Sequence, residues 1–136
     1  MKYMLDTNIC IYIMKQQPLA VAQRFATCRQ GEVTISAITL AELEYGVHRS
    51  SKATRSQNRR ALDALTKRIL PVPFERGAAK AYAAIRAAAP ERQRDALDKL
   101  IASHAKNLNL TLVTNNISDF RVYPGVTLEN WVEESS

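Results

Sequence analysis

The segment YMLDTN, residues 3–8, places an acid directly after a short apolar run. The apolar residues suit a buried β-strand over residues 3–5, while Thr7 and Asn8 favour a turn or a helix cap. In open α/β sheets, ligands bind in the crevice beyond the carboxyl ends of the strands. Because Asp6 stands at such an end, the segment predicts a functional site at that edge of the sheet.

Further apolar runs alternate with helical patterns along the chain. Strands are expected at residues 33–36, 69–72, 110–114 and 126–128, and helices from about residue 9 to 17, over 19–28, from about 39, and over 52–68, 75–89 and 95–108. The strands are continuous apolar runs, which indicates a parallel sheet covered on both faces. Pro71 and Pro73 confine one strand to a sheet edge or a strand end. We expect an α/β fold with a central, mainly parallel sheet of four to five strands.

Length and composition favour one ordinary globular domain over residues 1–136. No apolar stretch approaches the roughly 18 residues that a membrane helix needs, and the start of the chain lacks the pattern of a signal peptide. We therefore expect a cytoplasmic protein without membrane contact. Cys10 and Cys28 lack metal-site spacing and are expected to be reduced rather than bridged.

The net charge of +6 is concentrated in one block, residues 49–68, where Asp63 is the single acid. Such a block favours a polyanionic partner such as nucleic acid, with an affinity that falls as salt rises. The candidate contacts are Arg49, Lys52, Arg55, Arg59 and Arg60. A solvated helix face explains the charge equally well.

Three further acids are expected near the edge that Asp6 occupies. Glu42 lies shortly after the strand 33–36, Asp98 lies in the first turn of the helix that leads to residue 110, and Asp119 follows the strand 110–113. Clustered carboxylates repel one another and raise one another's pKa, so such a group implies a cation. Oxygen ligands suit Mg²⁺ or Mn²⁺ rather than zinc. A hard divalent metal next to a basic surface is typical of a nuclease.

Each acid also has a plain structural interpretation. Asp6 could cap the helix that follows it, and Thr39 to Glu42 fits a capping box, in which the Glu serves the helix start. Asp98 could be a first-turn acid favoured by the helix dipole, behind Asp95 as N-cap. Asn116 and Asp119 could shape a turn. We take His48 and His104 as structural, and we expect Trp131 and the tyrosines to be core or partner contacts rather than base-stacking platforms.

Four motifs in this order resemble the PIN-domain toxins of the VapC type. They are MLDTN at residues 4–8, SAITLAELEYG at 36–46, ALDKLIASHA at 96–105, and LVTNN at 112–116 with the DF pair at 119–120. The resemblance covers nearly the whole chain. It implies a PIN-like three-layer α/β/α sandwich and an endoribonuclease that depends on Mg²⁺ or Mn²⁺. It also implies neutralisation by a VapB antitoxin and a homodimer, alone or within a larger toxin–antitoxin assembly.

The resemblance also implies roles for individual residues. Asp6, Glu42 and Asp98 match the family's acids, with Asp6 and Asp98 as principal metal ligands. Many relatives have Asp where this chain has Asn116, so either Asp119 fills the fourth acidic position or Asn116 is a neutral oxygen donor. The loop PERQRD, residues 90–95, replaces a PIG segment, and Asp95 could add a second acid there. Thr7, Asn8, Ser36, Thr114 and Asn116 are expected to hold the carboxylates through hydrogen bonds.

These predictions lead to one main functional expectation and two alternatives. We expect hydrolysis of single-stranded or loop RNA to 5′-phosphate and 3′-hydroxyl ends, with initiator tRNA in its anticodon stem-loop as the substrate that the resemblance suggests. The first alternative is a catalytically silent module that binds RNA or an antitoxin. The second is a DNA nuclease of the flap type, although its much larger chain and clamping insertions have no counterpart here.

Overall fold

The computed structural model describes residues 1–90, 92 and 94–132. Its centre is a five-stranded sheet in the order β3-β2-β1-β4-β5, built from Tyr3–Leu5 (β1), Val33–Ser36 (β2), Pro71–Val72 (β3), Thr111–Val113 (β4) and Leu128–Glu129 (β5). All four pairings are parallel, with Tyr3 opposite both Val33 and Thr111. The expected parallel sheet is confirmed, and the proline-flanked strand lies at its edge as predicted.

The strand order reverses beside β1. From β1 the chain moves outward to β2 and β3, and it then returns to place β4 and β5 on the other side of β1. The carboxyl ends of β1 and β4 therefore flank the switch point where α/β sheets bind ligands. Asp6 follows β1 and Thr114 follows β4 at this edge.

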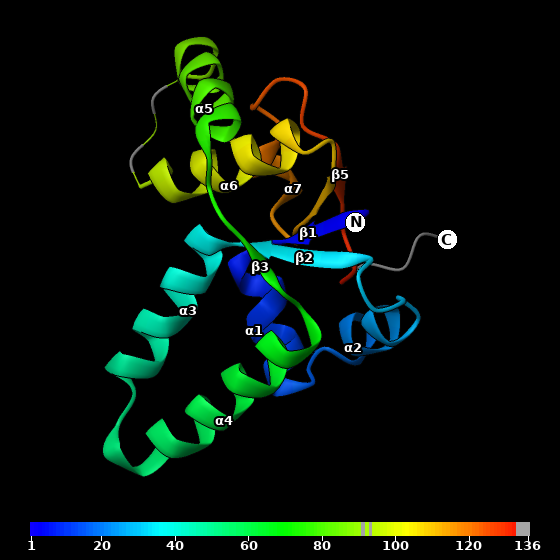
Figure 1. The fold of residues 1–136 in the computed structure, drawn as a ribbon, viewed down its shortest axis with the longest axis vertical. Helices are drawn as coiled ribbons and strands as arrows, with labels where there is room; N and C mark the ends of the chain where they lie inside the picture. Colours follow the sequence, from blue (N-terminus) through cyan, green and yellow to red (C-terminus); the bar gives the residue numbers. More distant parts are fainter. Residues whose placement is uncertain (91, 93, 133–136) are drawn as a thin grey trace.

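Helices cover both faces of the sheet (Figure 1). One face carries Thr7–Lys15 (α1), Leu19–Ala26 (α2), Ala37–Arg49 (α3) and Lys52–Arg68 (α4), and the other carries Arg76–Ala88 (α5), Ala96–Asn107 (α6) and Ile117–Phe120 (α7). The expected three-layer α/β/α arrangement is thus confirmed. The short helix α7 was not expected from the sequence.

Two hydrophobic cores follow from the alternation of side chains along each strand. In β1, Tyr3 and Leu5 belong to the core under α1 to α4, whereas Met4 belongs to the core under α5 to α7. In β4, Val113 and Leu112 divide in the same way. Because both faces are buried, these strands have to be continuously apolar, which is the pattern that predicted them.

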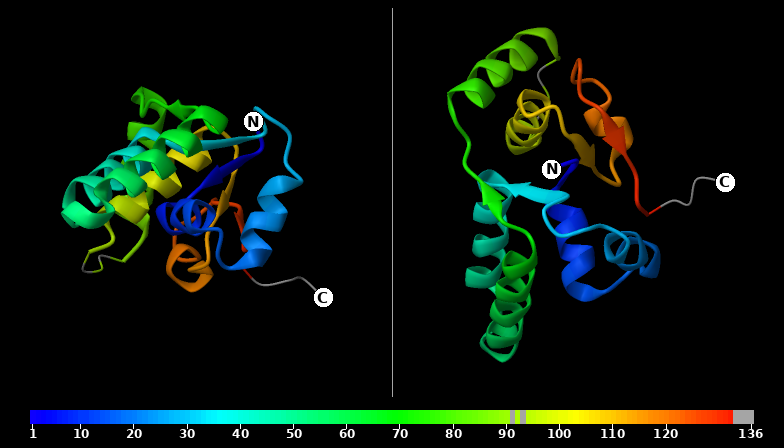
Figure 2. Two further views of the ribbon diagram at one scale, coloured as in Figure 1. Left: turned by 90° about the horizontal axis from the view of Figure 1, so that it is seen from below. Right: turned by 45° about the vertical axis from the view of Figure 1, so that its right-hand side comes forward.

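The helices α3 and α4 form an antiparallel pair that extends away from the sheet (Figures 1 and 2). Leu43 and Val47 of α3 and Leu62 and Leu65 of α4 are buried in the core that lies under α1 to α4, which anchors the pair to the domain. The outer surface of the pair carries most of the basic block.

Several boundaries differ from the sequence expectations. Helix α1 begins at Thr7 rather than near residue 9, and α3 begins at Ala37 rather than near residue 39, because the side chains of Asp6 and Ser36 cap them. No helix in the described part of the chain is long and apolar enough to cross a membrane. Both cysteines are free, with Cys10 buried and Cys28 half-buried.

Replacing Leu112 in the centre of β4 should cost the fold roughly 2–5 kcal/mol, because Leu112→Ala removes a fully buried side chain and leaves a cavity. The matched control is Leu70→Ala, since Leu70 is 76% exposed and its loss should change the free energy of unfolding by less than about 0.5 kcal/mol. Urea denaturation measures both values. Equal stabilities for the two variants would contradict the burial assigned to β4.

Candidate acidic active site

Asp6 lies between β1 and α1 and is the N-cap of the helix, so one residue joins the strand to the helix. Its backbone N–H donates to the Val113 carbonyl at 3.0 Å, and its Oδ1 accepts the Ile9 N–H at 2.9 Å. The capping role considered for Asp6 is therefore real. Burial nevertheless raises the pKa of Asp6 to about 6, although the Thr114 hydroxyl and the amides of Ile9 and Asn8 favour the charged form.

Asp98 lies in the first turn of α6, where the helix dipole favours an acid. Its carboxyl is half-buried, and its pKa is also raised to about 6. The causes are burial first, followed by repulsion from Asp6 and Glu42. The helix approaches the sheet closely because Ala102 and Ala105 are fully buried on its inner side.

Glu42 lies one turn into α3 and is held by a residue from another helix. The Thr7 hydroxyl of α1 donates to Glu42 Oε1 at 2.7 Å. The capping-box interpretation of Glu42 is wrong, because α3 begins at Ala37 with Ser36 as its N-cap, not at Thr39. Glu42 is therefore free of a role at the helix start and is oriented by Thr7.

The three acids line one hollow of about 160 Å³. Its lining consists of Asp6, Thr7, Asn8, Glu42, Asp98, Ile101, Asn116 and Phe120, and none of these eight residues is basic. Both raised pKa values reflect carboxylates buried near one another without a cation among them. A hollow with this charge has the chemistry of a cation site.

The oxygen donors of the hollow suit a Mg²⁺ ion that keeps several waters, rather than an ion enclosed entirely by protein ligands. Within residues 1–90, 92 and 94–132, no three His, Cys, Asp or Glu side chains lie close enough together to hold a metal ion by themselves. The acids thus share one hollow but are less tightly gathered than the sequence suggested. Mg²⁺ commonly takes one or two carboxylates and keeps several waters, so Asp6 and Asp98, with the Asn116 side chain nearby, fit such an ion.

Comparison with known proteins agrees with this architecture. Residues 3–125 match the family model described as the PIN domain. The chain belongs to the PIN-domain family. Within that family it groups with the VapC proteins, since it is 39% identical to the protein named Ribonuclease VapC2 of Rickettsia felis, over 96% of this chain and 98% of that protein. It is 37% identical to the tRNA(fMet)-specific endonuclease VapC of Shigella flexneri, with the same coverage of each chain.

Solved structures show the same PIN fold. The crystal structure of VapBC2 from Rickettsia felis bound to a promoter DNA fragment matches with a TM-score of 0.84 and 37% identity, covering 96% of this chain and 99% of that one. The DNA-bound VapBC of Salmonella typhimurium matches with a TM-score of 0.85 and 33% identity, covering 96% and 98%. These matches extend over nearly the whole chain.

One acid of this PIN domain, Asp95, is committed to ion pairs rather than to the hollow. Asp95 Oδ1 lies 3.3 Å from Lys99 Nζ, and Oδ2 lies 3.4 Å from Arg92 Nε and accepts the Tyr123 hydroxyl at 3.0 Å. The pKa of Asp95 is lowered, because these partners outweigh the effect of burial. Asp95 occupies the N-cap position of α6 as expected, but its side chain makes no cap hydrogen bond. The i, i+4 spacing of Asp95 and Lys99 is the signal that could have revealed this pair.

Asn116 and Asp119, the two candidates for the fourth acidic position, lie in different places. Asn116 lines the hollow, whereas Asp119 lies outside the lining on α7 with 54% of its side chain exposed. Phe120 is buried, so the preceding Asp119, about 100° around the helix, points outward. Arg92 binds it there, with Nη1 3.7 Å from Oδ1 and Nη2 donating to the Asp119 carbonyl at 2.6 Å. Asp119 still raises the pKa of Asp98 from this position.

The residues expected to hold the carboxylates fall into two groups. Thr7 binds Glu42, and the Thr114 hydroxyl interacts with Asp6 while also accepting the Asn116 N–H at 3.0 Å. Ser36 acts elsewhere: its Oγ accepts the Ile38 N–H at 3.0 Å and lies 2.8 Å from His104 Nδ1. The reason is that α3 starts directly after Ser36, so its hydroxyl is needed at the helix start.

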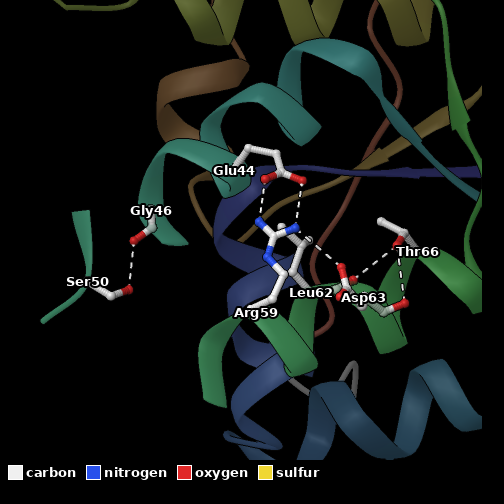
Figure 3. A network of polar contacts seen from close by, with 7 residues as sticks. All are labelled: Glu44, Gly46, Ser50, Arg59, Leu62, Asp63 and Thr66. Atoms are coloured by element: carbon white, nitrogen blue, oxygen red, sulfur yellow. Dashed lines mark hydrogen bonds and ion pairs between the residues drawn. The ribbon is translucent and has the colours of Figure 1, made fainter. Parts of the chain in front are cut away.

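Much of the basic face that we expected to contact RNA is engaged within the α3–α4 pair. Arg59 bridges Glu44 and Asp63 (Figure 3), and the guanidinium lowers the pKa of Glu44. Arg55 donates to the carbonyls of His48 and Ser50 at 3.2 and 3.0 Å. The remaining two arginines among these candidates have local contacts, Arg60 with Ser56 and Arg49 with Tyr45, while Lys52 is exposed.

Asp6→Asn should stabilise the metal-free protein at pH 8. Because the folded-state pKa is raised from 3.8 to about 6, the folded state binds more protons than the unfolded one in this window, so the free energy of unfolding falls as pH rises. The full effect above pH 6 is roughly 3 kcal/mol, and Asn can still cap α1. We expect a gain of about 1–3 kcal/mol at pH 8 that shrinks towards pH 4.

The matched control for this stability prediction is Asp119→Asn, which removes an exposed and ion-paired acid and should give no such gain. Denaturant titrations in EDTA at pH 4, 6 and 8 measure both variants. A gain for Asp6→Asn that grows as the pH falls would show that its carboxylate is stabilised, rather than strained, by its surroundings.

Proposed function

We propose that this chain is the toxin of a type II toxin–antitoxin system, acting as an endoribonuclease that depends on Mg²⁺ or Mn²⁺. The observation that carries the proposal is the hollow that Asp6, Glu42 and Asp98 share without a basic neighbour in its lining. The ribonuclease names of the VapC relatives from Rickettsia felis and Shigella flexneri support the same activity.

In this proposal, Asp6 and Asp98 hold the ion, because burial raises the pKa of both carboxyls and each also has an acidic neighbour that raises it further, Glu42 for Asp6 and Asp6 for Asp98. The ion would supply Lewis-acid chemistry, lowering the pKa of water and neutralising charge on the phosphodiester. Glu42, whose Oε1 accepts the Thr7 hydroxyl, would orient the attacking water. Among the residues that line the hollow, none is a histidine or lysine that could activate the 2′-hydroxyl. The products should therefore carry 5′-phosphate and 3′-hydroxyl ends.

The substrate proposed is RNA, with initiator tRNA in its anticodon stem-loop as the first target to test. The Shigella flexneri relative is named for tRNA(fMet), and its similarity extends over 96% of this chain. The net charge of +6 suits a polyanion. Cleavage of this tRNA would inhibit translation.

The partners proposed are a VapB-type antitoxin and a second copy of the chain. Similar solved structures from Rickettsia felis and Salmonella typhimurium are VapBC complexes, which supports an antitoxin partner here. Because no basic residue lines the acidic hollow, a basic side chain of the antitoxin would block it. Salt would weaken this contact less than a contact between exposed charges, because buried charges are screened less.

Labelled tRNA incubated with the purified protein should be cut in the presence of Mn²⁺ and remain intact in EDTA, because the acids need the ion to approach a phosphodiester. Asp6→Asn and Asp98→Asn should each lower the cleavage rate by at least about 100-fold, while Asp119→Asn, outside the hollow, should retain most of the activity. Mapping of the ends should find 5′-phosphates.

Equal cleavage by the wild type and Asp6→Asn would point to a contaminating nuclease, and cyclic phosphate ends would exclude the water route. RNA binding without cleavage in Mn²⁺ would favour the catalytically silent module. A panel of purified tRNAs, with the same EDTA control, identifies the substrate.

Thr7→Val should lower kcat about 10- to 100-fold with little change in KM, because the hydroxyl that orients Glu42 is lost while the shape of the side chain is kept. Thr7→Ser, which restores the hydroxyl, is the matched control and should act like the wild type. Single-turnover cleavage assays measure both variants. Normal kcat in Thr7→Val would mean that Glu42 does not need this contact.

A further inference from the structure

Helix α3 carries a stripe of three residues that leads away from the acidic hollow. Glu42, Tyr45 and Arg49 follow one another at i, i+3 and i+7, so they lie on one side of the helix within about 60° of each other. The helical rise places Tyr45 about 4.5 Å and Arg49 about 10 Å along the axis from Glu42. The end of the stripe at Glu42 belongs to the hollow, and the rest runs onto the surface.

The stripe is not used to pack the PIN domain. The buried positions of α3 are Thr39, Leu43 and Val47, and the flank that meets α4 is marked by the ion pair of Glu44 with Arg59 (Figure 3). Tyr45 is 63% exposed, so most of its side chain is open to solvent. The Arg49 guanidinium lies over this ring at 5.7 Å from its centroid.

This pair has the chemistry of a nucleotide subsite. An exposed aromatic ring can stack on any base because every base has a π-face, and an arginine can stack or bind phosphate. Beyond Arg49 the surface continues to Lys52 at the start of α4, which is exposed and basic. A second copy of this chain would bring the same positive charge against this surface, whereas RNA is complementary to it.

We propose that Tyr45 and Arg49 bind an unpaired nucleotide of the RNA next to the phosphodiester held at the hollow. The base stacks on the Tyr45 ring, and the Arg49 guanidinium meets the neighbouring phosphate. This inference rests on the ribonuclease function proposed above and adds a strand direction, along α3 from Glu42 towards the tip of the α3–α4 pair. It also explains why an RNA loop, with its bases unstacked, suits this site better than a duplex.

The test compares Tyr45→Ala and Tyr45→Phe with Tyr82→Ala. Tyr82 and Arg86 of α5 form another i, i+4 Tyr–Arg pair, 3.3 Å apart, on the opposite side of the sheet, which makes Tyr82→Ala a matched control. Tyr45→Ala should raise KM for loop RNA about tenfold, since base stacking on aromatic side chains has this magnitude. Tyr45→Phe and Tyr82→Ala should stay within about twofold of the wild type, and kcat should change little in all three.

Abasic RNA provides the readout that locates the subsite. Affinities of the three variants, each combined with Asp98→Asn to keep the RNA intact, are measured on a series of RNAs in which one loop base at a time is removed. At one loop position near the cleavage site, the protein that keeps Tyr45 should bind the abasic RNA about tenfold more weakly than the intact RNA. The Tyr45→Ala protein should bind the two RNAs equally well. Sedimentation velocity on the same samples reports the oligomeric state.

The outcomes separate this inference from the proposed function. If the wild type cleaves RNA but Tyr45→Ala matches it in KM and shows no coupling to any base, the nucleotide subsite is wrong and the ribonuclease proposal stands. If Tyr45→Ala changes the oligomeric state without changing RNA affinity, the ring is a contact between copies and the subsite is again overturned. If the wild type neither binds nor cleaves RNA, the proposed function fails, and this inference fails with it.

Discussion

Burial of like charges at the switch point of the sheet is the constraint on which this structure depends. Asp6 follows β1, caps α1 and is buried beside Thr114. Its carboxylate therefore lies in a low-dielectric environment, which raises its pKa to about 6. Asp98 adds a second carboxylate from α6. The fold is destabilised by this burial and repulsion of charge, and the divalent cation proposed above would relieve them, so that binding and folding would be linked through the same side chains.

Two basic side chains near the hollow are paired with acids outside it, so they do not neutralise the acids that line the hollow. Lys99 is adjacent to Asp98 in the sequence and is buried, yet its ammonium pairs with Asp95 on another side of α6. Arg92 is held by Asp95, Asp119 and Tyr123 in the same way. These two cations are therefore paired with acids that do not line the hollow. The contacts of Arg92 join the loop before α6 to α7, next to Asp98 in the first turn of α6 and to Asn116 at the N-cap of α7.

The sequence predicted those parts of the site that local rules determine. A continuous apolar strand that stops on Asp6 follows from the parallel sheet, and Glu42 and Asp98 were placed by helix starts that lay within about two residues of the observed ones. The fourth position was not predictable, because it depends on a four-residue helix that turns Asp119 outward and brings Asn116 to the hollow. Ser36 was misassigned for a related reason: the exact start of α3 decides which hydroxyl serves as cap. Long-range pairs such as Arg92 with Asp119 leave no periodic signal.

Helix α3 shows how one element can serve both the chemistry and the recognition that a nuclease needs. Its inner side packs with Leu43 and Val47, one flank binds α4 through Glu44, and another flank presents Glu42, Tyr45 and Arg49. The α4 charges that the sequence made prominent are partly engaged within the pair, as Arg59 illustrates. The positive net charge of the chain acts over a long range and would attract a polyanion without direct contact. In the proposed nucleotide subsite, the exposed Tyr45 ring would set where along the RNA the acids act, because stacking requires contact and depends on an unpaired base.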